Sequence, residues 1–305
     1  MKEIKIYLSS FNKEVLYAYK KLKPNSELNG LLSFGTRKND YTNMIITDRA
    51  KFNGLILDSG AYTLNNAKNS KNTITLRGYI AFCSVPKIYK SFDFVFNFDE
   101  DFTLDGFYEN RENMNELEKA GINVVPVAHD YINECVDEIG YYIDRKYPII
   151  ALGFSEHKKR NKKKNIGIAV KRITNAGLNV HLLGVTQYSI LSEYPIAYCD
   201  SSSWAQEGLF GNIIWWNNDK QSENKTSRIR FLDKENSADK HKVHIGNYLH
   251  RKKFESYIKE NFGMTIDDLN GNNKEFNRQI VNIHFFVQLQ DEIRKAHIRN
   301  GIVLN

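Results

Sequence analysis

Residues 92–99 read FDFVFNFD, an apolar run rich in aromatic side chains that ends in an aspartate. This composition predicts a β-strand that is covered on both faces, as in a parallel sheet with helices on either side. Two further runs carry an aspartate at the same place, GLILDSG at residues 54–60 and PIAYCDS at residues 195–201. Because the carboxyl ends of parallel strands share one face, we expect the three aspartates to converge there.

The same arrangement recurs along the first two thirds of the chain. Short β-rich runs alternate with amphipathic or charged stretches of helical length, which is the pattern of successive βα units. Eight such runs predict a (β/α)8 barrel of the TIM type. The expected strands are residues 4–10, 30–34, 54–60, 92–99, 122–129, 147–154, 178–185 and 195–201, with 44–47 as an alternative to the weak second run.

The alternation stops after the eighth run. Residues 217–227 form a polar loop or linker, and residues 252–263 and 276–301 have the pattern of helices. The sequence therefore predicts a catalytic barrel over residues 1–210. A basic, partly helical extension over residues 211–305 is expected to pack on it.

Composition limits the class of protein. The chain has 305 residues, 41% of them hydrophobic, and it contains no run of the roughly 20 apolar residues that cross a bilayer. Its first residues do not have the pattern of a secretory signal. The three cysteines, Cys83, Cys135 and Cys199, are far apart, so neither a disulfide framework nor a zinc knuckle is indicated. We therefore expect a reducing, cytoplasmic location.

Charge indicates a polyanionic partner. Lys and Arg number 43 against 36 Asp and Glu, a net charge of +7. The densest basic run directly follows the strand predicted at residues 147–154, which places it at the strand-end face, where it would contact a phosphate backbone. An ordinary solvated loop is the alternative. The candidate backbone-binding residues are Lys158, Lys159, Arg160, Lys162, Lys163 and Lys164.

Five strand-end segments carry a family resemblance. They are LDSGAY (57–62), FNFDE (96–100), ALGF (151–154), HLLGV (181–185) and YCDSSSW (198–204). In this order they resemble the segments around the base pocket of the tRNA-guanine transglycosylase superfamily of the queuine and archaeosine type. The small phage and DNA-acting members, which insert a 7-deazaguanine, are the most similar in pattern.

The resemblance implies a pentosyltransferase that replaces guanine in nucleic acid with a 7-deazaguanine such as preQ0. DNA is favoured over tRNA as the partner, the protein would be phage-encoded and act in the host cytoplasm, and neither a metal nor another cofactor is expected. Departures from the family pattern include Ala61, Thr63 and Phe154. The chain also cannot build the three-cysteine, one-histidine zinc site of the tRNA-acting members, so their tRNA-docking subdomain is absent or rebuilt.

Base exchange on an intact sugar requires two carboxylate groups with different roles. Two successive inversions retain the configuration at the sugar carbon, which requires one nucleophile and one acid/base group. The resemblance gives Asp200 as the nucleophile that forms a covalent glycosyl intermediate, and Asp58 as the general acid/base. The residues expected around the base are Asp99, Ser59, Gly60, His129, Gly153 and Tyr62.

Other functions stay open on the residues alone. A related enzyme could act on tRNA, and a barrel without catalysis could bind nucleic acid while its aspartates merely cap helices, the commoner role of an aspartate at a strand end. A third class is an isomerase or lyase on a small sugar phosphate, which would need a lysine or metal cluster inside the barrel. The sequence shows no His-x-His or paired carboxylate–histidine set for such a metal.

Overall fold

Two compact units make up the chain in the computed structural model. The barrel unit comprises residues 1–10, 28–201 and 293–305, and the second unit comprises residues 11–27 and 202–292. The predicted boundary at residue 210 and the packing of the extension on the barrel stay predictions. The structure describes residues 2–36, 45, 47–61, 74–103, 105–131, 135–153, 162–232, 242–271 and 273–305.

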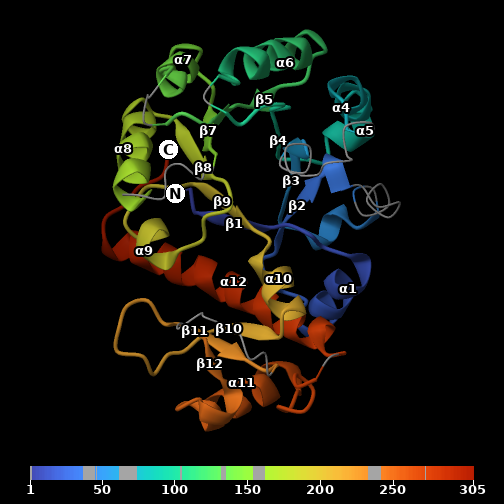
Figure 1. Cartoon of the computed structure of the whole chain (residues 1–305), viewed down its shortest axis with the longest axis vertical. Helices are drawn as coiled ribbons and strands as arrows, with labels where there is room; N and C mark the ends of the chain where they lie inside the picture. Colours follow the sequence, from blue (N-terminus) through green and yellow to red (C-terminus); the bar gives the residue numbers. More distant parts are fainter. Residues whose placement is uncertain are drawn as a thin grey trace. The chain divides into compact units, whose positions relative to one another are not determined.

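The barrel unit contains nine parallel strands in a nearly closed sheet, with helices between them in the chain (Figure 1). This confirms the predicted TIM-type α/β barrel with a C-terminal helix. The order around the sheet is β5-β4-β3-β2-β1-β9-β8-β7-β6. The strands are β1 (Lys5–Leu8), β2 (Asn29–Ser33), β3 (Gly54–Asp58), β4 (Phe94–Phe96), β5 (Val124–Val125), β6 (Val127–Ala128), β7 (Ile149–Leu152), β8 (Asn179–Leu182) and β9 (Tyr198–Ser201).

Proline explains why eight predicted runs give nine strands. Strands β5 and β6 are two halves of the run predicted at 122–129, separated by Pro126, which has no N–H to donate to a ladder. One half pairs with β4 and the other with β7. The carbonyl of Val125 accepts from the N–H of Asn97 at 3.0 Å, and the carbonyl of Pro126 accepts from the N–H of Ala151 at 2.9 Å. This single segment therefore joins the two ends of the sheet.

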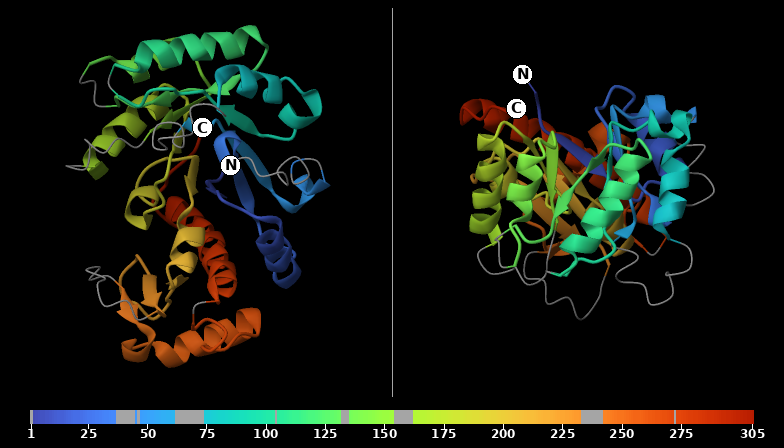
Figure 2. Two further views of the ribbon diagram at one scale, coloured as in Figure 1. Left: turned by 45° about the vertical axis from the view of Figure 1, so that its right-hand side comes forward. Right: turned by 90° about the horizontal axis from the view of Figure 1, so that it is seen from above.

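Each of the eight predicted runs contains strand residues, including the weak second run, which is β2. The alternative at 44–47 lies partly outside the described residues. Helices cover the outside of the strand ring, as Figure 2 shows for residues 76–175. The helices of the barrel unit are α4 (Leu76–Cys83), α5 (Pro86–Tyr89), α6 (Phe107–Lys119), α7 (Glu138–Asp144), α8 (Lys162–Asn175) and α9 (Tyr188–Leu191), with 3-10 turns η1 (Phe34–Thr36) and η2 (Arg49–Lys51).

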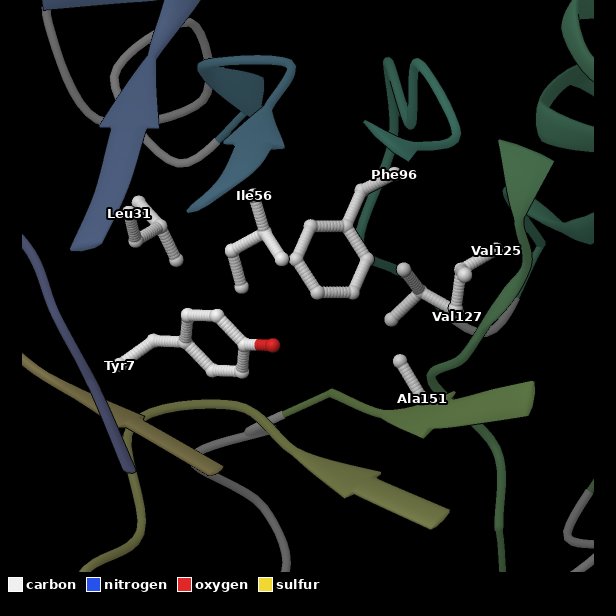
Figure 3. Close-up of a cluster of buried hydrophobic side chains, with 7 residues drawn as sticks. All are labelled: Tyr7, Leu31, Ile56, Phe96, Val125, Val127 and Ala151. Atoms are coloured by element: carbon white, nitrogen blue, oxygen red, sulfur yellow. The ribbon is translucent and has the colours of Figure 1, made fainter. Parts of the chain in front are cut away.

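Alternate strand residues fill the inside of the barrel. Leu31 on β2 is in register with Ile56 on β3, and both side chains point inward toward Phe96 on β4 (Figure 3). Branched and aromatic side chains of this kind make the barrel interior a packed core rather than a pore. The interior cluster consists of Tyr7, Leu31, Ile56, Phe96, Val125, Val127 and Ala151.

The second unit combines helices with a small sheet that the sequence did not predict. Strand β10 pairs antiparallel with β11, which pairs parallel with β12. The side chain of Arg278 is fully buried and donates to the carbonyls of Gly208, Leu269 and Gly271. The elements are α1 (Lys13–Leu22), α10 (Ser203–Leu209), β10 (Asn212–Trp216), β11 (Thr226–Arg230), β12 (Val243–His244), η4 (Ile245–Asn247), α11 (Arg251–Phe262) and α12 (Glu275–Arg299), whose last turns from Ile293 belong to the barrel unit.

Within the described part of the chain, no helix has the length and apolar character that crossing a membrane requires.

Substitution of a core residue tests the packed interior. We expect Ile56→Ala to lower the free energy of unfolding by about 2–5 kcal/mol, because the cavity it leaves lies among buried neighbours. The matched control is Ile168→Ala on α8, where the isoleucine is 58% exposed and the expected loss is far smaller. Urea denaturation of both variants measures the difference, and equal losses would contradict a filled barrel interior.

Candidate active site

Asp58 closes β3 at the strand-end face of the barrel. It is in register with Ser33 on β2, whose hydroxyl donates to its carboxylate, and its Oδ2 accepts from the N–H of Gly60 at 2.9 Å. Burial, and to a smaller extent the nearby charges of Asp200 and Asp99, raise the pKa of Asp58 to about 6, while the two hydrogen bonds act in the opposite direction. Asp58 is therefore the carboxyl group that carries a proton in slightly acidic solution.

Asp200 lies on β9 and is held from one side. Its Oδ1 is 2.9 Å from Nε2 of His181 on β8 and accepts from the N–H of Gly184 at 3.2 Å. Its Oδ2 accepts no hydrogen bond from any residue that the structure describes. The Asp200 side chain is 13% exposed, and both of the donors that the described residues supply to it bind the same carboxylate oxygen.

Asp99 follows β4 and is buried, with 2% of its surface exposed. Its Oδ1 accepts from the amide of Asn97 at 2.7 Å, and its Oδ2 is 3.1 Å from Nε2 of His129. The ring of His129 stacks on Phe102, and its backbone N–H donates to the buried Glu138 at 2.7 Å. Each oxygen of Asp99 thus has one protein partner, and the role predicted for Asp99 in ligand binding stays a prediction.

The expected convergence of the three aspartates is seen in the electrostatics of Asp58, whose pKa responds to both of the others. Two glycines expected near the site are needed for packing. A Cβ on Gly60, which has φ of +87°, would lie 2.4 Å from the backbone of Gly35. A Cβ on Gly153 would lie 2.6 Å from Nδ1 of His129, so Gly153 lets that ring sit against β7.

The remaining predicted residues have different outcomes. Ser59 is buried beside Asp58. Tyr62, Lys158, Lys159 and Arg160 lie outside the described residues. Lys162 starts α8, and of the rest of the basic run Lys163 and Lys164 are exposed, with Lys163 paired to Glu193. Contact of this run with a phosphate backbone stays a prediction.

Sequence reasoning missed three groups that define the site. His181 interrupts the apolar part of LNVHLLGV, and Asn97 interrupts FVFNFD in the same way. These interruptions were the signal, because a polar side chain inside a barrel needs a hydrogen-bond partner. Gly184 donates through its backbone, which no side-chain pattern reveals.

Among the residues that the structure describes, no group of three or more histidine, cysteine, aspartate or glutamate side chains is arranged to hold a metal ion. Cys83 and Cys199 are buried and Cys135 is exposed, all three as free thiols.

Comparison with known proteins corrects the family prediction. No family model matches the chain, and no curated protein matches it. One similar solved structure is described, on a provisional basis, as a fructose-1,6-biphosphate aldolase of Coccidioides immitis, with TM-score 0.46, 12% identity, and 97% of this chain and 92% of that chain covered. Another is the YdjI aldolase of Escherichia coli K12, with TM-score 0.46, 13% identity, and 97% and 93% covered.

These structural matches are aldolases and not transglycosylases, so the predicted transglycosylase superfamily, the base-exchange function and the pentosyltransferase class are contradicted. The two alternatives on nucleic acid, modification of tRNA and binding without catalysis, are not supported either. The physical reason is that aspartate and glycine recur at barrel strand ends for turns and helix caps, so five short segments resemble a family without sharing its chemistry. At this similarity the matches assign no substrate to the chain.

Stability against pH tests the environment of Asp58. Its pKa rises from the usual 3.8 to about 6 on folding, so the folded state binds the proton more tightly than the unfolded chain. The stabilisation is present below pH 3.8 and is lost as pH rises through about 6. Asp58→Asn should lack this pH dependence. Between pH 3.8 and about 6, the free energy of unfolding of the unsubstituted protein should therefore fall by about 3 kcal/mol relative to that of Asp58→Asn.

Urea denaturation at a series of pH values measures this difference. The control is Glu116→Gln, which changes an exposed carboxylate on α6 and should follow the unsubstituted protein. Identical pH profiles for Asp58→Asn and the unsubstituted chain would show that Asp58 is solvated.

Gly153→Ala tests the contact with His129. The added methyl group has to displace the imidazole and lengthen its hydrogen bond to Asp99, so we expect a loss of roughly 1–3 kcal/mol in the free energy of unfolding. Gly78→Ala on α4 is the control, because its new Cβ would meet no atom closer than 3.2 Å and alanine favours a helix. Urea denaturation compares the two, and an unaffected Gly153→Ala protein would contradict the contact.

Proposed function

We propose that this protein is an acid–base enzyme that moves a proton on a small carbonyl compound, within the isomerase or lyase classes. The observation that carries the proposal is the unlike setting of Asp58 and Asp200 at one face of the barrel. When two titratable groups of one type are given different environments, the environments assign the acid and the base.

Asp58 is proposed as the acid. With a pKa raised to about 6, its carboxyl group is protonated in mildly acidic solution and donates a hydrogen bond to a carbonyl oxygen. Burial strengthens such a hydrogen bond, because the surrounding dielectric constant is lower than in water. This neutral carboxyl would supply the electrophile that a lysine or a metal ion supplies in other barrel enzymes.

Asp200 is proposed as the base. Its Oδ2 takes the proton from the carbon next to the carbonyl group, and the electron pair of that C–H bond becomes the new carbon–carbon double bond. The carbonyl oxygen takes the proton of Asp58, which gives a neutral enediol and leaves Asp58 ionised. In a substrate with a hydroxyl group on the carbon next to the carbonyl, Asp200 then returns its proton to the former carbonyl carbon. The hydroxyl group on the other carbon gives its proton to Asp58 and becomes the new carbonyl group, so both carboxyl groups return to their starting states and atoms and charge balance.

Solvent exchange tests this proposal without a known substrate. Small aldoses, ketoses and 2-oxo acids are incubated singly in D2O, and proton NMR follows loss of the hydrogen next to the carbonyl group. Asp200→Asn should abolish exchange, and Asp58→Asn should slow it by roughly 10²–10⁴-fold. Exchange should decline as pH rises through about 6, where Asp58 loses its proton.

Glu116→Gln is the control and should exchange at the unsubstituted rate, since that carboxylate is exposed on α6. The proposal fails if no compound of the panel exchanges between pH 5 and 8, or if Asp200→Asn exchanges as fast as the unsubstituted enzyme.

A further inference from the structure

The imidazole of His181 on β8 is fully buried and contacts the carboxylate of Asp200 on β9. It lies edge-on to Phe96, with ring centroids 4.9 Å apart, and stacks on Tyr198 at 6.4 Å. Phe94 contacts it edge-on at 6.0 Å. An aromatic core of this kind fixes the plane of the ring and gives it no room to rotate.

The only polar contact that the structure gives His181 within its described part joins Nε2 to Oδ1 of Asp200, at 2.9 Å. Since a carboxylate oxygen accepts, Nε2 carries the proton in this contact. Nδ1 is buried and has no hydrogen-bond partner among the described residues. A core position that leaves one ring nitrogen unsatisfied is costly, so an apolar residue would serve packing better.

We infer that His181 is a positioning residue, which fixes the rotation of the Asp200 carboxylate so that Oδ2 faces the substrate. The N–H of Gly184 reaches the same oxygen, Oδ1, at 3.2 Å. The two donors come from one strand and its following turn, and both leave Oδ2 without a described partner. This inference rests on the proposed function only for its kinetic consequence, since the geometry is independent of the reaction.

Two substitutions separate the hydrogen bond from the packing. His181→Phe keeps a ring against Phe96 and Tyr198 but removes the donor. His181→Gln keeps a donor at the position of Nε2 and removes the ring. If His181→Phe fails to fold, His181→Leu takes its place, and urea denaturation establishes folding for each protein.

The first measurement needs no substrate. Carbon-13 NMR of protein labelled at the aspartate carboxyl groups follows the titration of Asp200, whose resonance is identified by its loss in Asp200→Asn. We expect the titration midpoint to move to higher pH in His181→Phe, because a donor to the ionised form is removed, and to stay near its original position in His181→Gln. His284→Phe is the control, since that buried histidine is bonded to Tyr19 and not to Asp200.

The second measurement is the exchange rate of the carbonyl compound found above. The exchange rate of His181→Phe should be roughly tenfold to hundredfold lower than that of the unsubstituted protein, which is the effect of one hydrogen bond to a charged group. The fall of the exchange rate in acidic solution should also begin at a higher pH in this variant. His181→Gln should recover most of the rate. An Asp200 titration unchanged in the folded Phe or Leu variant overturns the inference. A displaced titration in a protein that exchanges no compound supports the positioning role and contradicts the proposed function instead.

Discussion

Closure of the parallel sheet through residues 124–128 is the constraint on which the strand-end face depends. A parallel sheet with open edges would leave backbone donors and acceptors unpaired, and here one short segment pairs with β4 at its start and with β7 at its end. Pro126 gives its carbonyl to Ala151 and has no amide of its own to satisfy. Because His129 comes directly after this segment, closure of the barrel also brings His129 to Asp99.

The three strand-end aspartates show how one residue type is given different properties by its neighbours. Asp99 has a partner on each oxygen, Asp200 has both donors on one oxygen, and the half-buried Asp58 has its pKa raised to about 6. The differences come from neighbouring strands, since Ser33 ends β2, His129 directly follows β6 and His181 lies on β8. The barrel therefore works as a scaffold that distributes hydrogen-bond donors unequally around its rim.

Much of the fold could be predicted from the sequence because the strands are apolar on both faces. Runs such as GLILD and YPIIALGF have few other stable arrangements, and each contains one strand of the barrel. The small sheet of the second unit could not be predicted. Its middle strand, TSRIR, has the composition of a polar loop, and its last strand has only two residues.

The site could be predicted only in part. The aspartates were visible because they end apolar runs, whereas His181, Asn97 and Gly184 become partners only when the strands are placed side by side. The function was harder to predict from the sequence than the site residues were. A lysine or a metal site was the expected mark of an isomerase or lyase, and a carboxyl group whose pKa is raised by burial leaves no such mark in the residue order. A family resemblance drawn from five short segments was then contradicted by the structural matches.

The route of the chain through the barrel unit has a consequence for folding. Strand β1 pairs with β9, from Lys5 opposite Tyr198 to Leu8 opposite Ser201, and Arg294 forms an ion pair with Glu3 at 3.1 Å. One edge of the first strand can pair with β2 early in synthesis, but the other edge meets β9 only after residues 198–201 have been made. Contacts of such long sequence separation slow folding, so during translation β1 keeps one unpaired strand edge, which can associate with other chains until β9 covers it.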